Sequence, residues 1–126
     1  MSREPPFMLD GARVVAYAEL DASRASRFSS AVVAGVTLDP GQVAGLVIAE
    51  NLVDGGLFML HCNRDWETIA AAGYATEQDA RESAEHAYAG VAIGWRAYRE
   101  LTPEERQEVE TTRAFLREIA EEFRDP

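Results

Sequence analysis

The chain has 126 residues, of which 47% are hydrophobic and 27% charged, and its net charge at pH 7 is −10. This composition predicts one globular domain and excludes a disordered chain. The single cysteine excludes an internal disulfide, and no apolar run reaches the length of about 18 residues that a membrane-spanning helix needs. The acidic charge disfavours nucleic acids and anionic membranes as partners. Residues 1–6 lack the apolar run of a signal peptide, so we expect a cytoplasmic protein.

The first part of the chain predicts a loose lead-in followed by β-strands. Residues 1–10 form the lead-in, and alternating side chains in Ala12–Leu20 predict the first strand, with Val14 and Ala16 on one face. The polar residues 21–30 predict a loop.

Four further segments predict strands that follow one another in an antiparallel meander. Ala31–Leu38 is the second strand, with a bend at Gly35, and the Asp-Pro-Gly turn at 39–41 follows it. The apolar segment Val43–Val53 predicts a central strand. Asp54-Gly55-Gly56 then predicts a hairpin. It leads into the last two strands, Leu57–Cys62 and Trp66–Ala72, which the turn Asn63–Asp65 separates.

The pattern then changes to that of a helix. Thr76 predicts an N-cap, and Glu77 and Asp79 suit the positive end of the helix dipole. We expect this helix to end at Gly90 or Gly94. Its small residues form one narrow face that can approach a sheet closely: Ala80, Ala84, Ala87 and Val91.

The segment 102–124 predicts a long amphipathic helix from Pro103 to about Phe123. Thr102, Pro103 and Glu105 form a capping box with proline at the first helical position. The apolar stripe of this helix either packs on its own sheet or forms a homodimer. The candidate dimer interface consists of Val109, Phe115, Leu116, Ile119 and Phe123.

Together these elements predict a single α+β domain over residues 1–126. Its antiparallel meander sheet has four or five strands, one packed helix and a long C-terminal amphipathic helix.

No group of residues in the sequence predicts catalysis, a metal site or a cofactor. His61 and Cys62 are neighbours on a strand, so their side chains point to opposite faces and cannot form a nucleophile–base pair. Glu82 and His86 share a helix face, a spacing that is common on solvated surfaces. Two histidines and one cysteine lack the spacing of zinc ligands, and no phosphate-binding loop occurs.

Aromatic residues beside charged ones provide the candidate partner-binding residues, which are Asp65, Trp66, Trp95 and Tyr98. Tryptophan is enriched in the energetic centres of interfaces. The alternative interpretation is that these aromatic side chains anchor the core.

Two resemblances follow from these residues. Between Leu46 and Trp95 the chain resembles a group of short bacterial proteins without an assigned function. The residues concerned are Phe58, Leu60, Cys62, Asp65, Trp66, Ala80, Ala84, Glu85, Tyr88, Gly90, Val91 and Trp95. The segment from Gly73 to Ala84 is similar to the partial RNase-H-like domain of HicB-type antitoxins. HicB-type chains usually add a DNA-binding element, whereas the C-terminal helix here is acidic, so DNA binding is not carried over.

Three classes of function fit the sequence. The favoured one is a non-enzymatic protein-binding module, such as an immunity- or antitoxin-like inhibitor of a basic protein partner. The alternatives are a small-ligand-binding protein or enzyme with a pocket between sheet and helices, and a self-assembling structural domain.

Overall fold

The structure is a computed structural model that describes residues 4–20, 31–33, 36–38, 43–88 and 94–123. Its elements in chain order are β1 (Met8–Leu9), β2 (Ala12–Glu19), β3 (Ala31–Val33), β4 (Val36–Leu38), β5 (Gly45–Asn51), β6 (Leu57–Cys62), β7 (Thr68–Tyr74), α2 (Glu77–Ala87), β8 (Arg96–Ala97) and α3 (Pro103–Glu122). The loop expected at 21–30, the bend at Gly35, the turn at 39–41 and the positions Gly90 and Val91 lie outside the described residues.

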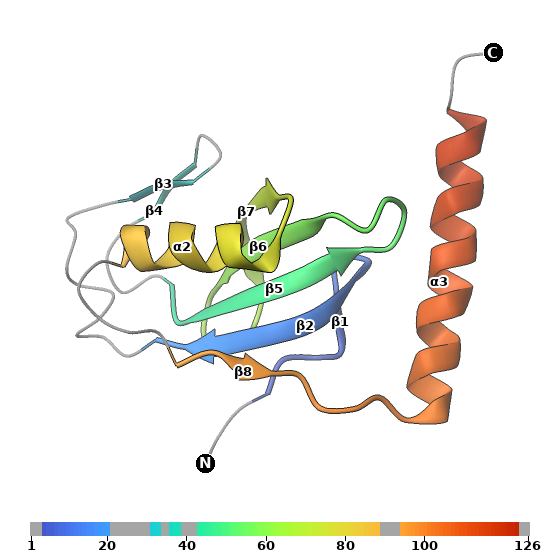
Figure 1. The fold of residues 1–126 in the computed structure, drawn as a ribbon, viewed down its shortest axis with the longest axis horizontal. Helices are drawn as coiled ribbons and strands as arrows, with labels where there is room; N and C mark the ends of the chain where they lie inside the picture. The colour runs from blue at the N-terminus through green and yellow to red at the C-terminus, as the bar shows by residue number, and fades with distance from the viewer. Residues whose placement is uncertain (1–3, 21–30, 34–35, 39–42, 89–93, 124–126) are drawn as a thin grey trace.

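The main sheet is antiparallel, with the strand order β1-β2-β5-β6-β7 (Figure 1). The short strand β8 pairs with β2 at Ala16 and Tyr17, whereas β1 pairs with β2 at Ala12 and Arg13. Both short strands therefore cover parts of the same edge of β2, whose backbone groups would otherwise be open to another chain. The predicted α+β fold, with an antiparallel sheet and two helices, is confirmed.

Several predicted element boundaries are wrong. Ala31–Leu38 is not one strand but two, β3 and β4, which pair antiparallel with Val33 opposite Val36. β2 consequently pairs with β5 and not with the next segment along the chain. The lead-in expected at 1–10 contains β1. Helix α2 ends at Ala87, where Tyr88 leaves helical geometry, and not at a glycine.

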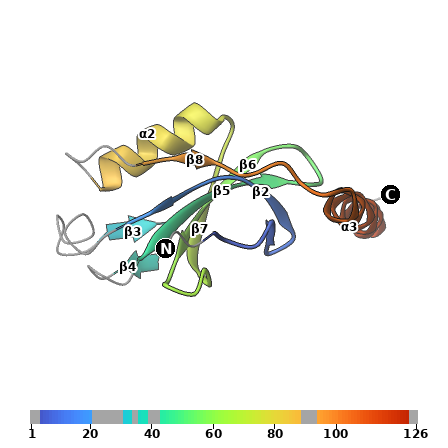
Figure 2. The same ribbon diagram turned by 90° about the horizontal axis from the view of Figure 1, so that it is seen from below.

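The main sheet buries side chains on both faces. Helix α2 covers one of them, where Ala80 and Ala84 allow it to approach closely (Figure 2). The sheet residues buried on this face include Ala16, Ala18, Leu46, Ile48 and Met59. Those buried on the other face are Ala12, Val14, Tyr17, Val47, Ala49, Leu60 and Cys62, with Trp66 packed against them. Fully burying one such aliphatic side chain stabilises the fold by roughly 1.5–3 kcal/mol.

Helix α3 stands beside the sheet and does not lie across it. In Figure 1 its axis runs past the end of the β5–β6 hairpin, and in Figure 2 it is seen nearly end-on, apart from the other elements. Among the residues that the structure describes, no helix combines the length and apolar character needed to cross a bilayer.

Candidate functional site

The start of α3 is tied to the body of the protein through Arg99. The Arg99 guanidinium donates to both carboxylate oxygens of Glu105, at 2.7 and 2.9 Å, and its Nε donates to Glu4 at 2.8 Å. The bonds from Arg99 lower the pKa of Glu105 to about 2, so this carboxylate stays charged. The same carboxylate accepts from the backbone N–H of Thr102, which completes the predicted capping box. The direction in which α3 leaves the sheet is therefore fixed at its first turn.

One side of α3 faces the end of the sheet where β2 begins and β5 ends (Figure 1). Val109 is only 3% exposed, and Arg113 reaches Glu50 on β5 with 3.8 Å between Nη2 and Oε1. Leu116 lies near the turn between β1 and β2, since a methyl group added to Gly11 would be 3.6 Å from its Cδ1. These residues follow one another at helical spacing, so a single narrow strip of α3 makes the contact.

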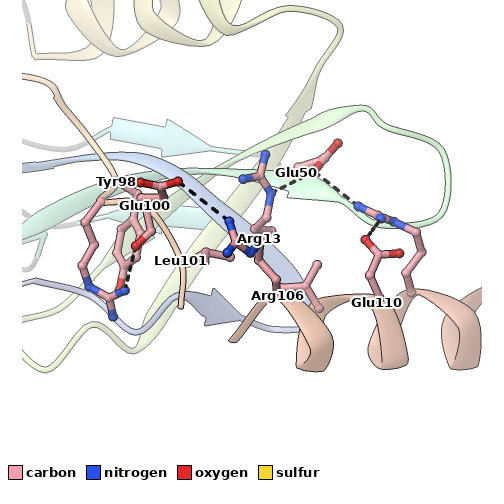
Figure 3. Close-up of a pocket in the computed structure, with 10 residues that line it drawn as sticks. Arg13, Glu50, Tyr98, Glu100, Leu101, Arg106 and Glu110 are labelled. Carbon is pink, nitrogen blue, oxygen red and sulfur yellow. Dashed lines mark hydrogen bonds and ion pairs between the residues drawn. The ribbon is translucent and has the colours of Figure 1, made fainter. Parts of the chain in front are cut away.

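A hollow of about 630 Å³ lies between the paired ends of β2 and β5 and the first half of α3, and we call it the α3 hollow (Figure 3). Its lining consists of Arg13, Glu50, Tyr98, Arg99, Glu100, Leu101, Arg106, Val109, Glu110 and Arg113. Arg13 and Glu50 are opposite each other in the β2–β5 register and form an ion pair with 3.1 Å between Nε and Oε1. Arg106 meets Glu100 at 3.8 Å.

From Phe115 onward, α3 and its C-cap residue Phe123 carry apolar side chains past the sheet (Figure 1). Phe115 is 59% exposed and Phe123 is 83% exposed, whereas Ile119 between them is half-buried. The three residues are four apart, so they form one row along the helix, which we call the distal row. Exposed aromatic side chains grouped on one face are characteristic of interaction sites.

Comparison with protein-family models, curated proteins and solved structures found no match. The likeness to short bacterial proteins and to HicB-type domains therefore stays a prediction.

The structure separates the four candidate partner-binding residues. Trp66 is only 7% exposed and packs edge-on against Tyr17 with 6.1 Å between ring centroids, while Asp65 beside it is exposed. Trp95 packs at the α2 face, where the Arg81 guanidinium lies 5.5 Å from the centre of its ring. Tyr98 lines the α3 hollow and donates to the carbonyl oxygen of Pro5 at 2.8 Å. In this fold the Trp66 ring thus has the role of a core anchor.

The candidate dimer residues divide into two groups. Val109 is buried against its own chain, and Leu116 lies near the β1–β2 turn. Phe115, Ile119 and Phe123 form the distal row, where the two phenylalanines keep most of their surface exposed. The first half of the apolar stripe of α3 thus packs against its own chain, which is the alternative considered from the sequence.

His61 and Cys62 face opposite sides of the sheet, as predicted. His61 Nδ1 lies 2.9 Å from the Tyr88 hydroxyl under α2, whereas Cys62 packs with Leu60 and Trp66 on the other face. Burial lowers the pKa of His61 to about 4 and raises the pKa of the Cys62 thiol to about 12. At neutral pH the imidazole is uncharged and the sulfur is a thiol. Within the described part of the chain, no three His, Cys, Asp or Glu side chains could together hold a metal ion.

The charged lining of the α3 hollow was not predicted from the sequence. A signal for it exists on α3, because Arg106, Val109 and Arg113 recur at helical spacing and would share a face. No such signal exists for Arg13 and Glu50, which are 37 positions apart and meet only through the strand register.

Proposed function

We propose that the chain is a non-enzymatic protein-binding module whose docking element is the distal row of α3. The observation that supports this most directly is the exposure of Phe115 and Phe123 on a helix that is anchored at its first turn. Many partner proteins bind an amphipathic helix in a groove through apolar anchors one turn apart. The row Phe115, Ile119 and Phe123 has that spacing.

The charge of α3 favours a basic partner. The helix carries seven glutamates and three arginines, a net charge of −4, within a chain of net charge −10. Glu118 and Glu122 lie next to the distal row in sequence and suit an apolar groove with a basic rim. An inhibitor that masks a basic effector, as immunity proteins and antitoxins do, is the form of this function that the charge favours.

Affinity capture with matched variants tests this proposal. Phe115→Ala combined with Phe123→Ala shortens two anchors, leaves the charge of α3 unchanged and does not lower its helix propensity. Gln107→Ala combined with Ala114→Ser alters two exposed positions on another side of the helix and serves as the control. We expect the wild type and the control to capture the same basic protein, and the phenylalanine variant to lose it. Capture that survives the loss of both phenylalanines would contradict the proposal.

A second copy of the chain is the other candidate partner, because the apolar stripe of α3 continues through the distal row. Two helices of net charge −4 repel each other, which is a cost that a basic partner avoids. If the chain forms a homodimer, light scattering gives twice the chain mass of 13.9 kDa. Phe115→Glu combined with Phe123→Glu then gives a folded monomer. A wild-type mass of 13.9 kDa at high concentration would exclude the homodimer.

A further inference from the structure

Arginines are concentrated at the α3 hollow. Four of the chain's 12 arginines line it, together with three glutamates, so the lining has a net charge of +1 in a chain of net charge −10. The four are Arg13, Arg99, Arg106 and Arg113. Because Glu4 and Glu105 pair with Arg99, and Glu110 pairs with Arg113, an anion in the hollow meets chiefly the guanidinium groups of Arg13 and Arg106.

Two of these arginines have donors that the described residues do not use. Arg13 contacts Glu50 through Nε, and within the described part of the chain its two terminal amino groups have no partner. Arg106 meets Glu100 at 3.8 Å, longer than a hydrogen bond, and the Glu100 side chain is 90% exposed. Such an exposed ion pair contributes little to stability, so another carboxylate can replace Glu100. By contrast, Arg99 is held by Glu4 and Glu105.

The rest of the lining is apolar. Val109 is buried at the base of α3, Leu101 is half-buried, and the ring of Tyr98 adds an aromatic wall. Sites for small molecules usually have volumes of roughly 300–1,000 Å³ and combine apolar walls with a few polar groups. The hollow, at about 630 Å³, has both properties.

We propose that the α3 hollow binds a small organic acid. Its carboxylate lies at Arg13 and Arg106, which Figure 3 draws between Glu50 and Glu100, and its apolar body packs on Leu101 and the ring of Tyr98. Guanidinium groups match a carboxylate because they offer parallel N–H donors. Inorganic phosphate is a poorer match, because its higher negative charge is repelled by the three glutamates of the lining and it has no apolar part to pack on Leu101 and Tyr98. The site is independent of partner docking because the distal row occupies the other half of α3.

Titration with phenylacetate, followed by amide chemical shifts of the ¹⁵N-labelled full chain, tests the site. We expect saturable shifts at Leu101 and Val109 with a dissociation constant of order 1 mM, as suits a ligand of this size. Phenylacetamide has the same shape without the charge and should bind roughly tenfold more weakly, because a hydrogen bond to a charged group is lost.

Two substitutions locate the carboxylate. Arg106→Gln and Arg13→Gln should each weaken phenylacetate binding roughly tenfold. Arg64→Gln, at an exposed position in the β6–β7 turn, should leave it unchanged. Arg106 is more than half exposed, so its replacement leaves the core intact, which circular dichroism checks. Equal affinity for the acid and the amide, wild-type affinity in Arg106→Gln, or no saturable shift at Leu101 and Val109 would each overturn the proposal.

Discussion

The hydrogen bond between His61 and Tyr88 links the sheet to α2 in the interior of the protein. Burial lowers the pKa of His61 from its usual 6.5 to about 4. Between these two values the unfolded chain binds a proton that the folded chain does not bind. The stability contributed by the neutral imidazole is therefore complete above pH 6.5 and is lost as the pH falls toward 4.

This linkage predicts a pH-dependent free energy of unfolding. Because of His61, we expect the free energy of unfolding to fall by about 2 kcal/mol between pH 7.5 and pH 5. Chemical denaturation at each pH measures this change. His61→Phe combined with Tyr88→Phe replaces both partners with apolar side chains of similar shape, so neither is left unpaired. In that variant the free energy of unfolding should depend much less on pH, whereas His86→Gln should keep the pH dependence of the wild type. A double variant with the wild-type pH dependence would show that His61 does not cause it.

Gly45 allows the Trp66 ring to lie directly against β5. A methyl group at Gly45 would meet this ring, with Cη2 only 2.7 Å away, and Trp66 already has a positive φ of 61°. Neither the ring nor its backbone can move without disturbing the packing against Tyr17.

Gly45→Ala should therefore destabilise the protein by about 1–3 kcal/mol, measured by chemical denaturation, with a change in tryptophan fluorescence. Gly94→Ala is the matched control, because an added methyl group there meets nothing within 4 Å. The control should stay within about 0.5 kcal/mol of the wild type. Equal effects of the two substitutions would refute the role assigned to the Gly45–Trp66 contact.

A bulge in β2 shows why side-chain direction was only partly predictable from the sequence. Alternation placed Val14 and Ala16 on one face, but the β2–β5 register shifts between them and they pack in different halves of the core. A bulge adds one residue and reverses the alternation beyond it. The register between β5 and β6 has no shift next to His61, so the alternation of side chains holds there. The opposite directions of His61 and Cys62 were therefore predicted correctly.

At the scale of elements, the sequence predicted those segments whose signal is local. Leu57–Cys62 has the predicted bounds of β6, and α3 begins at Pro103 with the predicted capping box. The two-residue strand β8 was not predicted, since its side chains are exposed and only backbone pairing with β2 defines it. β3 and β4 were merged because the apolar pattern continues through their connection.

The capping box of α3 gives a prediction about local stability. Thr102 Oγ1 accepts from the Glu105 backbone N–H at 3.1 Å, so Thr102→Ala leaves that donor without its cap. The loss should cost about 1 kcal/mol and make hydrogen exchange in the first turns of α3 roughly fivefold faster.

Thr111→Ala provides the comparison for this experiment. Thr111 is exposed in the middle of α3 and caps nothing, so exchange in that variant should not accelerate. If Thr102→Ala leaves exchange in the first turns unchanged, the anchoring of α3 rests on Arg99 and not on the capping box.

At the scale of the whole molecule, α3 places two different surfaces on one helix. Its first half closes a charged hollow against the sheet, and its second half presents the distal row. The apolar stripe with Phe115 and Phe123 could be predicted from helical periodicity alone. The hollow could not, because it depends on how α3 sits against β2 and β5, which no local pattern encodes.

The central claim is that the distal row docks a basic protein. Its most direct test is the affinity of the chain for the captured partner. Titration calorimetry should show that replacing both Phe115 and Phe123 with alanine weakens binding at least tenfold, whereas the Gln107→Ala/Ala114→Ser control binds like the wild type. Because the charges are complementary, binding should also weaken as salt is raised. Equal affinity of the phenylalanine variant and the wild type, at low and at high salt, would contradict the claim.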